Sequence, residues 1–306
     1  MKKTKIILTI IIITAAVSFG ALAVSADETT QPTTVLKTVA KKKPLKKIKV
    51  KVSKKEIKKF FKKSAFIGNS IGLGQRMFMN SEGKKMIGHP KMLVKGCYAF
   101  TNDKGGKYSL SYKGYSGPAK KVVKRTKAKR VFINMGTNDL FEGPKKVFKR
   151  YKKYIAGIKK ESKGIVVYIE SMTPVYKSGQ KKKLNNRNVN KLNKLLKNYC
   201  KKKKDLYYID ITTALKDSSG GLKKKYTSDS YVHMTMAGYR VWTKKVLKYV
   251  KKQIKTEKRA KVAVKYAKKF RTSNEVNRAK KLVKKLPKST VKNKLKKKLK
   301  KVKVKQ

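Results

Sequence analysis

Acidic residues, cysteine and histidine are all scarce in this chain of 306 residues. It contains 15 Asp and Glu against 86 Lys and Arg, so its formal net charge is +71. With only two cysteines and two histidines, a disulfide-stapled scaffold and a metal site built on several Cys or His side chains are excluded. Hydrophobic residues nevertheless make up 39% of the chain and aromatic residues 9%. The sequence therefore predicts a hydrophobic core and excludes a wholly disordered polycation.

The large positive charge predicts an anionic partner, because so strong a field concentrates anions around the protein. Charge alone does not choose between nucleic acid, an anionic membrane and an anionic wall polymer.

The two cysteines, Cys97 and Cys200, leave a second question open. They are compatible with one disulfide bridge or with two free thiols.

The first 26 residues predict a signal peptide. Lys2, Lys3 and Lys5 precede an apolar run at 6–23, and the small residues of 24–26 suit cleavage. The alternative is an uncleaved N-terminal anchor. In either case we expect an exported protein, secreted and associated with the cell surface. Its Lys-rich surface would there meet anionic cell-wall polymers, and nucleic acid would be bound only non-specifically.

The rest of the chain divides into three parts by composition. Residues 27–58 are rich in Thr, Pro and Lys and are predicted to be a linker. Residues 59–254 alternate short apolar runs with amphipathic helical patterns, which predicts an α/β domain with a parallel sheet. Residues 255–306 are predicted to be a Lys-rich tail of three short amphipathic helices. The expected strands of the α/β domain are 65–68, 130–136, 164–170 and 206–210.

The candidate catalytic residues follow from scarcity and from position. Ser70 lies in FIGNSIGLG, where a predicted strand turns into a helix, so backbone N–H groups beside it can stabilise an oxyanion. The alternative for Ser70 is a simple helix N-cap. His233 lies four residues after Asp229, a carboxylate that could orient its ring.

Two further segments offer donors for an oxyanion. Asn138, in the sequence GTND, follows the predicted strand 130–136, and its side-chain amide can donate a hydrogen bond. The alternative is an ordinary Asn/Asp turn. Gly117, at the end of KGYSG, permits close approach of the backbone and can offer a bare N–H.

Taken in order, these four segments resemble the SGNH (GDSL-like) esterase and lipase superfamily. The resemblance implies a three-layer α/β/α sandwich of the flavodoxin-like type and a hydrolase without metal or organic cofactor. It implies Ser70 as the nucleophile and His233 as the general base and then acid. The oxyanion hole would consist of the N–H groups of Ser70 and Gly117 with the Asn138 side chain, and Asp139 would support the Asn138 loop.

The chain departs from the family pattern at two positions. The acid that precedes the nucleophile in the family is Asn69 here, which can still accept and donate local hydrogen bonds. The family acid three residues before the histidine is replaced by Ser230, and Asp229 lies one residue farther away. Either Asp229 still reaches His233, or Ser230 or a backbone carbonyl orients the ring.

The expected function is a secreted or wall-associated serine esterase that removes O-acyl groups, in particular O-acetyl groups, from carbohydrate. Two alternatives stay open on the sequence. If water were excluded from the acyl-enzyme, the same residues would make an O-acyltransferase. The other alternative is a non-catalytic polycationic protein that binds the cell wall.

Overall fold

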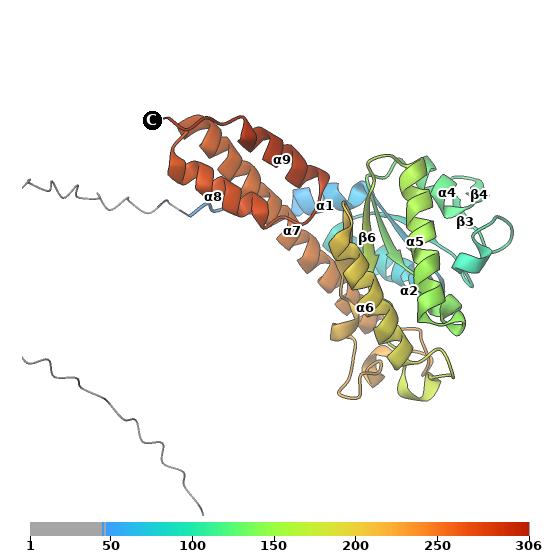
Figure 1. Cartoon of the computed structure of the whole chain (residues 1–306). Coiled ribbons are helices and arrows are strands. Elements are labelled where there is room, and N and C mark those ends of the chain that lie inside the picture. Colours follow the sequence, from blue (N-terminus) through green and yellow to red (C-terminus); the bar gives the residue numbers. More distant parts are fainter. Residues whose placement is uncertain (1–44, 46, 306) are drawn as a thin grey trace, which may run out of the picture. The chain divides into compact units, whose positions relative to one another are not determined.

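The structure is a computed structural model that describes Leu45 and residues 47–305 (Figure 1). The predicted signal peptide, residues 1–26, lies outside the described residues, as does the predicted linker up to residue 44. Among the described residues, no helix has both the length and the apolar character that a membrane crossing requires.

A five-stranded parallel sheet forms the centre of the fold, with its strands in the spatial order β2-β1-β5-β6-β7. The strands are β1 (Ser64–Gly68), β2 (Lys91–Val94), β5 (Arg130–Asn134), β6 (Val166–Glu170) and β7 (Leu206–Ile209). Four of them coincide with the apolar runs that predicted strands, since strands buried on both faces have nearly continuous apolar sequences. The strand β2 was not predicted, because it is short and begins with a lysine.

Helices form wherever apolar residues recur at intervals of three or four. In α5, for example, Val147, Tyr151, Ile155 and Ile158 are buried along one side, and Pro144 occupies the first turn, where it needs no N–H donor. The helices are α1 (Lys54–Lys62), α2 (Ser70–Phe78), α3 (Lys84–Ile87), α4 (Ala119–Arg125), α5 (Pro144–Glu161), α6 (Asn186–Lys202), α7 (Met236–Phe270), α8 (Ser273–Lys284) and α9 (Thr290–Lys300).

Helices cover both faces of the sheet (Figure 1). On one face the rings of Phe66, Phe132 and Tyr168 stack, with centroids 4.4 and 4.5 Å apart. Helices α1 and α7 cover these rings, since Phe60 and Tyr249 meet Tyr168 edge-on. Helices α4, α5 and α6 pack side by side on the opposite face. The predicted three-layer α/β/α sandwich is confirmed.

The order of the strands determines where a ligand can bind. The chain goes from β1 to its neighbour β2 on one side and then crosses to β5 on the other side. In open parallel sheets, ligands bind at the carboxyl ends of the strands, beside the point where the order reverses. That point is the end of β1 at Gly68, directly before Asn69 and Ser70.

The C-terminal region is helical, as predicted, but its helices are divided differently. The helix predicted near 235–253 and the first predicted tail helix are one continuous helix, α7, of 35 residues. Residues 255–259 are all polar and interrupt the apolar pattern, yet they include no Gly or Pro that would end a helix. The second half of α7 packs with α8 and α9 around a separate small core that includes Val264, Val276 and Leu295.

The last residues of the predicted linker belong to the folded unit. Ser53 caps α1 by a capping box in which its hydroxyl accepts from the Glu56 N–H and the Glu56 side chain accepts from the Ser53 N–H. Ile57 is buried in the main core, and Ile48 is buried in the core of the C-terminal helices. The folded unit therefore begins before residue 59.

Both cysteines are free thiols, with Cys97 exposed and Cys200 buried. This excludes the disulfide that the sequence left open. No group of three or more His, Cys, Asp or Glu side chains suited to a metal ion occurs within the described part of the chain.

Candidate active site

Ser70 lies where β1 turns sharply into α2. It is the first residue of α2, and Asn69 is the N-cap, whose side-chain oxygen accepts a hydrogen bond from the Ile71 N–H at 3.0 Å. The turn is tight because two glycines face each other: a Cβ on Gly68 would lie 3.0 Å from the Cα of Gly72. Strand, turn and helix together hold the Ser70 hydroxyl at the carboxyl edge of the sheet, half-buried.

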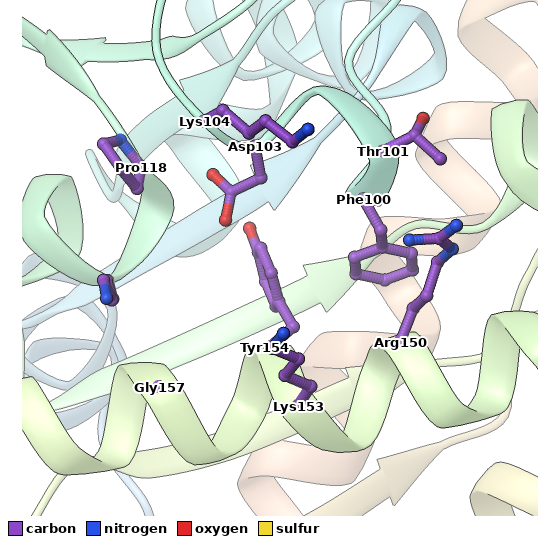
Figure 2. A pocket seen from close by; sticks show the side chains of 10 residues that line it. Phe100, Thr101, Asp103, Lys104, Pro118, Arg150, Lys153, Tyr154 and Gly157 are labelled. Atoms are coloured by element: carbon purple, nitrogen blue, oxygen red, sulfur yellow. The ribbon is translucent and has the colours of Figure 1, made fainter.

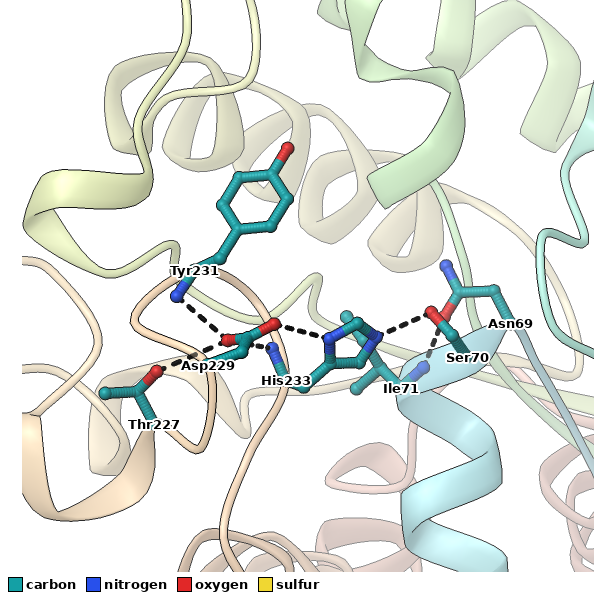
Figure 3. Close-up of polar contacts among 7 residues, drawn as sticks. All are labelled: Asn69, Ser70, Ile71, Thr227, Asp229, Tyr231 and His233. Carbon is teal, nitrogen blue, oxygen red and sulfur yellow. Dashed lines mark hydrogen bonds and ion pairs between the residues drawn. The ribbon is translucent and has the colours of Figure 1, made fainter.

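Three of the predicted residues form a continuous chain of side-chain contacts (Figure 3). His233 Nε2 lies 2.9 Å from Ser70 Oγ, and His233 Nδ1 lies 2.5 Å from Asp229 Oδ2. Ser70 and His233 are 163 positions apart in the sequence. Ser70 begins α2 at the end of β1, and His233 lies in the loop that precedes α7. The fold brings these two places together.

Asp229 reaches His233 although it lies four residues before it. The intervening Ser230 has a φ of 54°, in the left-handed region, and this conformation accommodates the additional residue. The other carboxylate oxygen of Asp229 accepts hydrogen bonds from the N–H groups of Tyr231 and His233, at 2.9 and 3.1 Å. The carboxylate is thus fixed in place, and Asp229 rather than Ser230 or a carbonyl orients the ring.

The environment of Asp229 keeps its carboxylate ionised. Partial burial raises the pKa of Asp229, but the hydrogen bonds from His233 and from the Tyr231 N–H outweigh this effect, and the pKa lies below its ordinary value. The side chain of His233 is 41% exposed and that of Asp229 is 32% exposed. The contact between the three residues is therefore open to solvent and to a large ligand.

The glycine predicted for the oxyanion hole belongs to a hairpin outside the central sheet. Gly117 lies in an antiparallel hairpin, β3 (Leu110–Tyr112) and β4 (Tyr115–Gly117), where it pairs with Leu110. The first glycine after the second strand of the sheet is Gly96, next to the first turn of α2: a Cβ on Gly96 would lie 3.6 Å from Leu73. Gly96 is therefore a second candidate for the glycine of the oxyanion hole, beside the predicted Gly117.

The strand β2 determines where Gly96 lies. Lys95, which links β2 to Gly96, donates its backbone N–H to the Gly68 carbonyl at 3.3 Å, so the loop of Gly96 runs beside the end of β1. The sequence signal for this arrangement is the short run MLV (92–94) followed by KG. It was missed because three apolar residues are too few to indicate a buried strand.

Asn138 lies beside the same loop. It belongs to the short 3-10 helix η3 (Thr137–Glu142) after β5, and its side-chain NH₂ donates to the carbonyl of Tyr98 at 3.0 Å. An amide NH₂ has two hydrogens, so the second can still donate to a ligand. Gly96 and Asn138 thus flank the end of β1 from its two neighbouring strands.

Asp139, which the resemblance implies as a supporting residue, connects the two loops. Its side chain is fully buried and accepts a hydrogen bond from the Thr101 N–H at 3.3 Å. Burial raises its pKa to about 6, and the backbone N–H groups of Phe100 and Thr101 counteract part of this increase. Asp139 therefore fastens η3, which carries Asn138, to the segment that follows Gly96.

Asn69 was expected to accept and donate local hydrogen bonds, and among the described residues its side chain only accepts. Its oxygen caps α2, whereas its buried Nδ2 has no hydrogen-bond partner among the described residues. The substitution of an amide for the family carboxylate therefore preserves the helix cap and leaves one buried donor unpaired.

Nucleophile, base and acid in one hydrogen-bonded chain are the arrangement that serine hydrolases use for acyl transfer. Residues 104–241 match the model of the GDSL-like Lipase/Acylhydrolase family. The matched region is a GDSL-like lipase/acylhydrolase domain. The chain is accordingly an enzyme of the SGNH serine hydrolase type. The matched region includes Asn138, Asp229 and His233, while Ser70 and Gly96 precede it and join the site through the sheet.

Several solved structures resemble this GDSL-like domain. A GDSL-like lipase from Bacteroides thetaiotaomicron is 18% identical, with 62% of this chain and 87% of that chain covered and a TM-score of 0.49. A member of the lipolytic G-D-S-L family from Veillonella parvula is 17% identical, with 60% and 96% covered and a TM-score of 0.45. The C-terminal catalytic domain of a peptidoglycan O-acetyltransferase from Streptococcus pneumoniae is 14% identical, with 62% and 92% covered and a TM-score of 0.43. No curated protein sequence matches the chain.

Proposed function

We propose that this GDSL-like enzyme hydrolyses O-acyl esters, in particular O-acetyl groups on carbohydrate, through an acyl-enzyme on Ser70. The observation that carries the proposal is the pair of contacts from His233, 2.9 Å to Ser70 Oγ and 2.5 Å to Asp229. His233 Nε2 takes the Ser70 proton as Oγ attacks the ester carbonyl, and then donates it to the leaving alcohol. Asp229 holds the ring and stabilises the imidazolium. Water then attacks the acyl-enzyme by the same route.

The negative charge of the tetrahedral intermediate requires donors next to Ser70. We assign this role to the N–H groups of Ser70 and Gly96 and to the Asn138 side-chain amide. Ser70 is the first residue of α2, where N–H groups lack partners within the helix and the helix dipole favours an anion. The Ile71 N–H is already used by the Asn69 cap. The donors therefore come from three separate segments around the end of β1.

The exposure of the site favours a large substrate and hydrolysis. His233 and Asp229 are about as exposed as many surface residues, at 41% and 32% of their side chains. Such an open site can accept an ester on a polymer, and it admits water to the acyl-enzyme. An O-acyltransferase would have to exclude that water. Analysis of the products formed with and without an acceptor sugar separates hydrolysis from transfer.

We further propose that the protein acts outside the cell, at the cell surface. The apolar run at 6–23 after three lysines supports export, and the net charge of +71 supports retention on anionic wall polymers. Such retention should weaken steeply with salt, since exposed charges are screened. Release of the protein from isolated walls by increasing salt, at unchanged esterase activity, measures this contribution.

A fluorophosphonate probe tests the catalytic proposal directly. The probe reacts with an activated serine and should label Ser70, as identified by mass spectrometry of the labelled peptide. Labelling should be absent after heat denaturation, because the His233 contact is then lost. Labelling of another serine, or none, contradicts the assigned nucleophile.

Asp229→Asn tests the acid of the triad. The new amide would donate to His233 Nδ1 and force the proton onto Nε2, which then cannot accept the proton of Ser70. We expect kcat for an acetyl ester to fall by about 10³- to 10⁴-fold with little change in KM. Stopped or continuous ester assays measure the loss. An effect below about tenfold would show that Asp229 has no catalytic part.

Gly96→Ala and Gly117→Ala distinguish the two candidate glycines. A methyl group on Gly96 has room beside Leu73, at 3.6 Å, but stands next to the oxyanion, so we expect kcat to fall by about 10- to 100-fold. A methyl group on Gly117 would lie 2.8 Å from the Tyr115 hydroxyl, so that variant should lose stability and keep its kcat. The reverse pattern would restore Gly117 to the hole.

A further inference from the structure

A pocket of about 580 Å³ lies on the side of the domain formed by α4, α5 and the loop after β2, and we call it the α5 pocket (Figure 2). None of its lining residues belongs to the chain of Ser70, His233 and Asp229. Its floor includes the rings of Phe100 and Tyr154, which meet edge-on with centroids 5.0 Å apart. Its volume is within the range of small-molecule sites and exceeds that of a single sugar ring.

One carboxylate is held firmly at this pocket. Asp103 accepts a hydrogen bond from the Tyr98 hydroxyl at 2.8 Å and from the Ala119 N–H at 2.7 Å. Both bonds end on Oδ1, which leaves Oδ2 as an acceptor for the hydroxyl groups of a ligand. Figure 2 shows the Asp103 carboxylate close to the hydroxyl end of the Tyr154 side chain. A fixed acceptor beside aromatic rings is suited to a sugar, whose C–H faces pack on rings while its hydroxyls donate.

Three lysines surround the pocket without a salt bridge among the described residues: Lys104, Lys120 and Lys153. The fourth cation of the lining, Arg150, is bound to Glu142 by two hydrogen bonds, at 2.5 and 2.6 Å. The three lysines exceed the single charge of Asp103, so the pocket attracts an anionic group.

A glycine keeps one end of the pocket open. Gly157 lies inside α5, where glycine destabilises a helix by roughly 0.5–1 kcal/mol relative to alanine. Packing does not require it: a Cβ there would have only the side chain of Lys120 nearby, at 3.6 and 3.9 Å. A side chain at this position would instead project into the pocket, of which Gly157 is a lining residue.

We infer that the α5 pocket binds a sugar unit that carries an anionic group. The rings and the Asp103 carboxylate take the sugar, and the three lysines take the anion. The pocket is connected to the active site by the segment 96–103, which begins at Gly96 and ends at Asp103. The seven Cα-to-Cα steps from Gly96 to Asp103 span at most about 25 Å, so one acidic glycan can occupy both places. The inference adds a subsite to the proposed esterase. It rests on the proposed function only where one glycan is said to occupy the pocket and the active site together.

Binding to the full-length protein tests the inference, with glucuronic acid, glucose and glucose 1-phosphate as probes. Ligand-observed NMR in 150 mM salt should show glucuronic acid bound at least about tenfold more tightly than glucose, since a hydrogen bond to a charged group is stronger than a neutral one. Tighter binding of glucose 1-phosphate than of glucuronic acid would identify the anion as a phosphate and support the same site. Equal binding of glucose and of both anions overturns it.

Matched variants separate the pocket from the general positive field. Lys104→Ala with Lys153→Ala should weaken binding by about tenfold or more. Lys152→Ala with Lys160→Ala removes the same charge from exposed positions of α5 and should change it less than about twofold. Equal losses of affinity in the two double variants would show that the probe is held by nonspecific attraction to the positive surface and not by the pocket.

Two further variants test the pocket itself and its independence from catalysis. Gly157→Leu should fill the pocket and abolish binding while raising the Tm, because leucine favours the helix. Unchanged binding in this variant contradicts the site. Ser70→Ala should bind the sugar as the unaltered protein does. A failure of the proposed esterase activity would therefore leave the binding result intact, and a failure of binding would leave the esterase intact.

Discussion

Replacing Ser70 by alanine is expected to lower kcat for an acetyl ester by about 10⁴- to 10⁶-fold, with the protein still folded. The variant lacks the oxygen that His233 Nε2 contacts at 2.9 Å, so no acyl-enzyme can form. The fold should persist, because Ser70 starts α2 as its first residue and the cap is provided by Asn69. Initial rates on a chromogenic ester, with a thermal melt of both proteins, measure the two parts of this prediction.

The control for this variant is Ser81→Ala. Within the described part of the chain, the Ser81 hydroxyl donates only to backbone carbonyls of the preceding turn, those of Met77 and Phe78, so its loss should leave kcat unchanged. The triad also predicts non-additivity: adding His233→Ala to Ser70→Ala should cause little further loss, since the two residues act as one unit. If Ser70→Ala retains more than about a tenth of the activity, the proposed mechanism is wrong.

Replacing Glu170 by glutamine is expected to stabilise the protein at alkaline pH. Glu170 ends β6 and is buried with its Oε1 unpaired among the described residues. Burial raises its pKa from 4.5 to about 8, and the nearby indole N–H of Trp242 offsets part of this increase. At neutral pH the folded protein therefore holds Glu170 protonated, whereas the unfolded chain releases the proton.

This raised pKa makes stability decrease as pH rises. Below pH 4.5 the carboxyl is protonated in both the folded and the unfolded state, and its contribution to stability is fully present. As pH rises from 4.5 to about 8, this contribution is lost progressively. The difference between the two pKa values corresponds to about 5 kcal/mol as an upper limit. Glutamine does not titrate, so the free energy of unfolding of Glu170→Gln should not show this loss. Relative to that of the unaltered protein, it should increase by about 3–5 kcal/mol as pH rises from 5 to 8.5.

Urea unfolding of both proteins at several pH values measures this difference. Glu161→Gln is the matched control, since Glu161 lies at the surface and its bond with Lys124 lowers its pKa instead. That control should show no gain with rising pH. A difference between Glu170→Gln and the unaltered protein that stays constant across this range would mean that Glu170 is already ionised in the folded state.

The apolar strands and the scarce reactive residues were predictable from local sequence. Strands such as Val166–Glu170 are continuous apolar runs, and their alternation with helical patterns implies a parallel sheet. The positions of Ser70 after a strand and of His233 near one of the few acids also follow from neighbours in the chain. These features depend on short-range patterns and are therefore visible in one sequence.

Features that depend on pairing between distant segments were not predictable in the same way. Gly96 lies in the loop after β2, and only the pairing of β2 with β1 brings that loop to the end of β1, where α2 begins. Likewise, the left-handed conformation of Ser230 lets Asp229 contact His233 from a position one residue too far in the family pattern.

The sequence by itself thus determined the layers of the fold and the residues proposed for catalysis, because each depends on local patterns and on scarcity. The tertiary structure decided which of them meet. It placed the loop of Gly96 beside the end of β1, joined two predicted helices into α7 and buried Glu170 near Trp242. Strand order, helix continuity and burial arise from contacts between residues far apart in the chain. The local pattern of a single segment does not specify which distant segment it will contact, so these three features cannot be predicted from it.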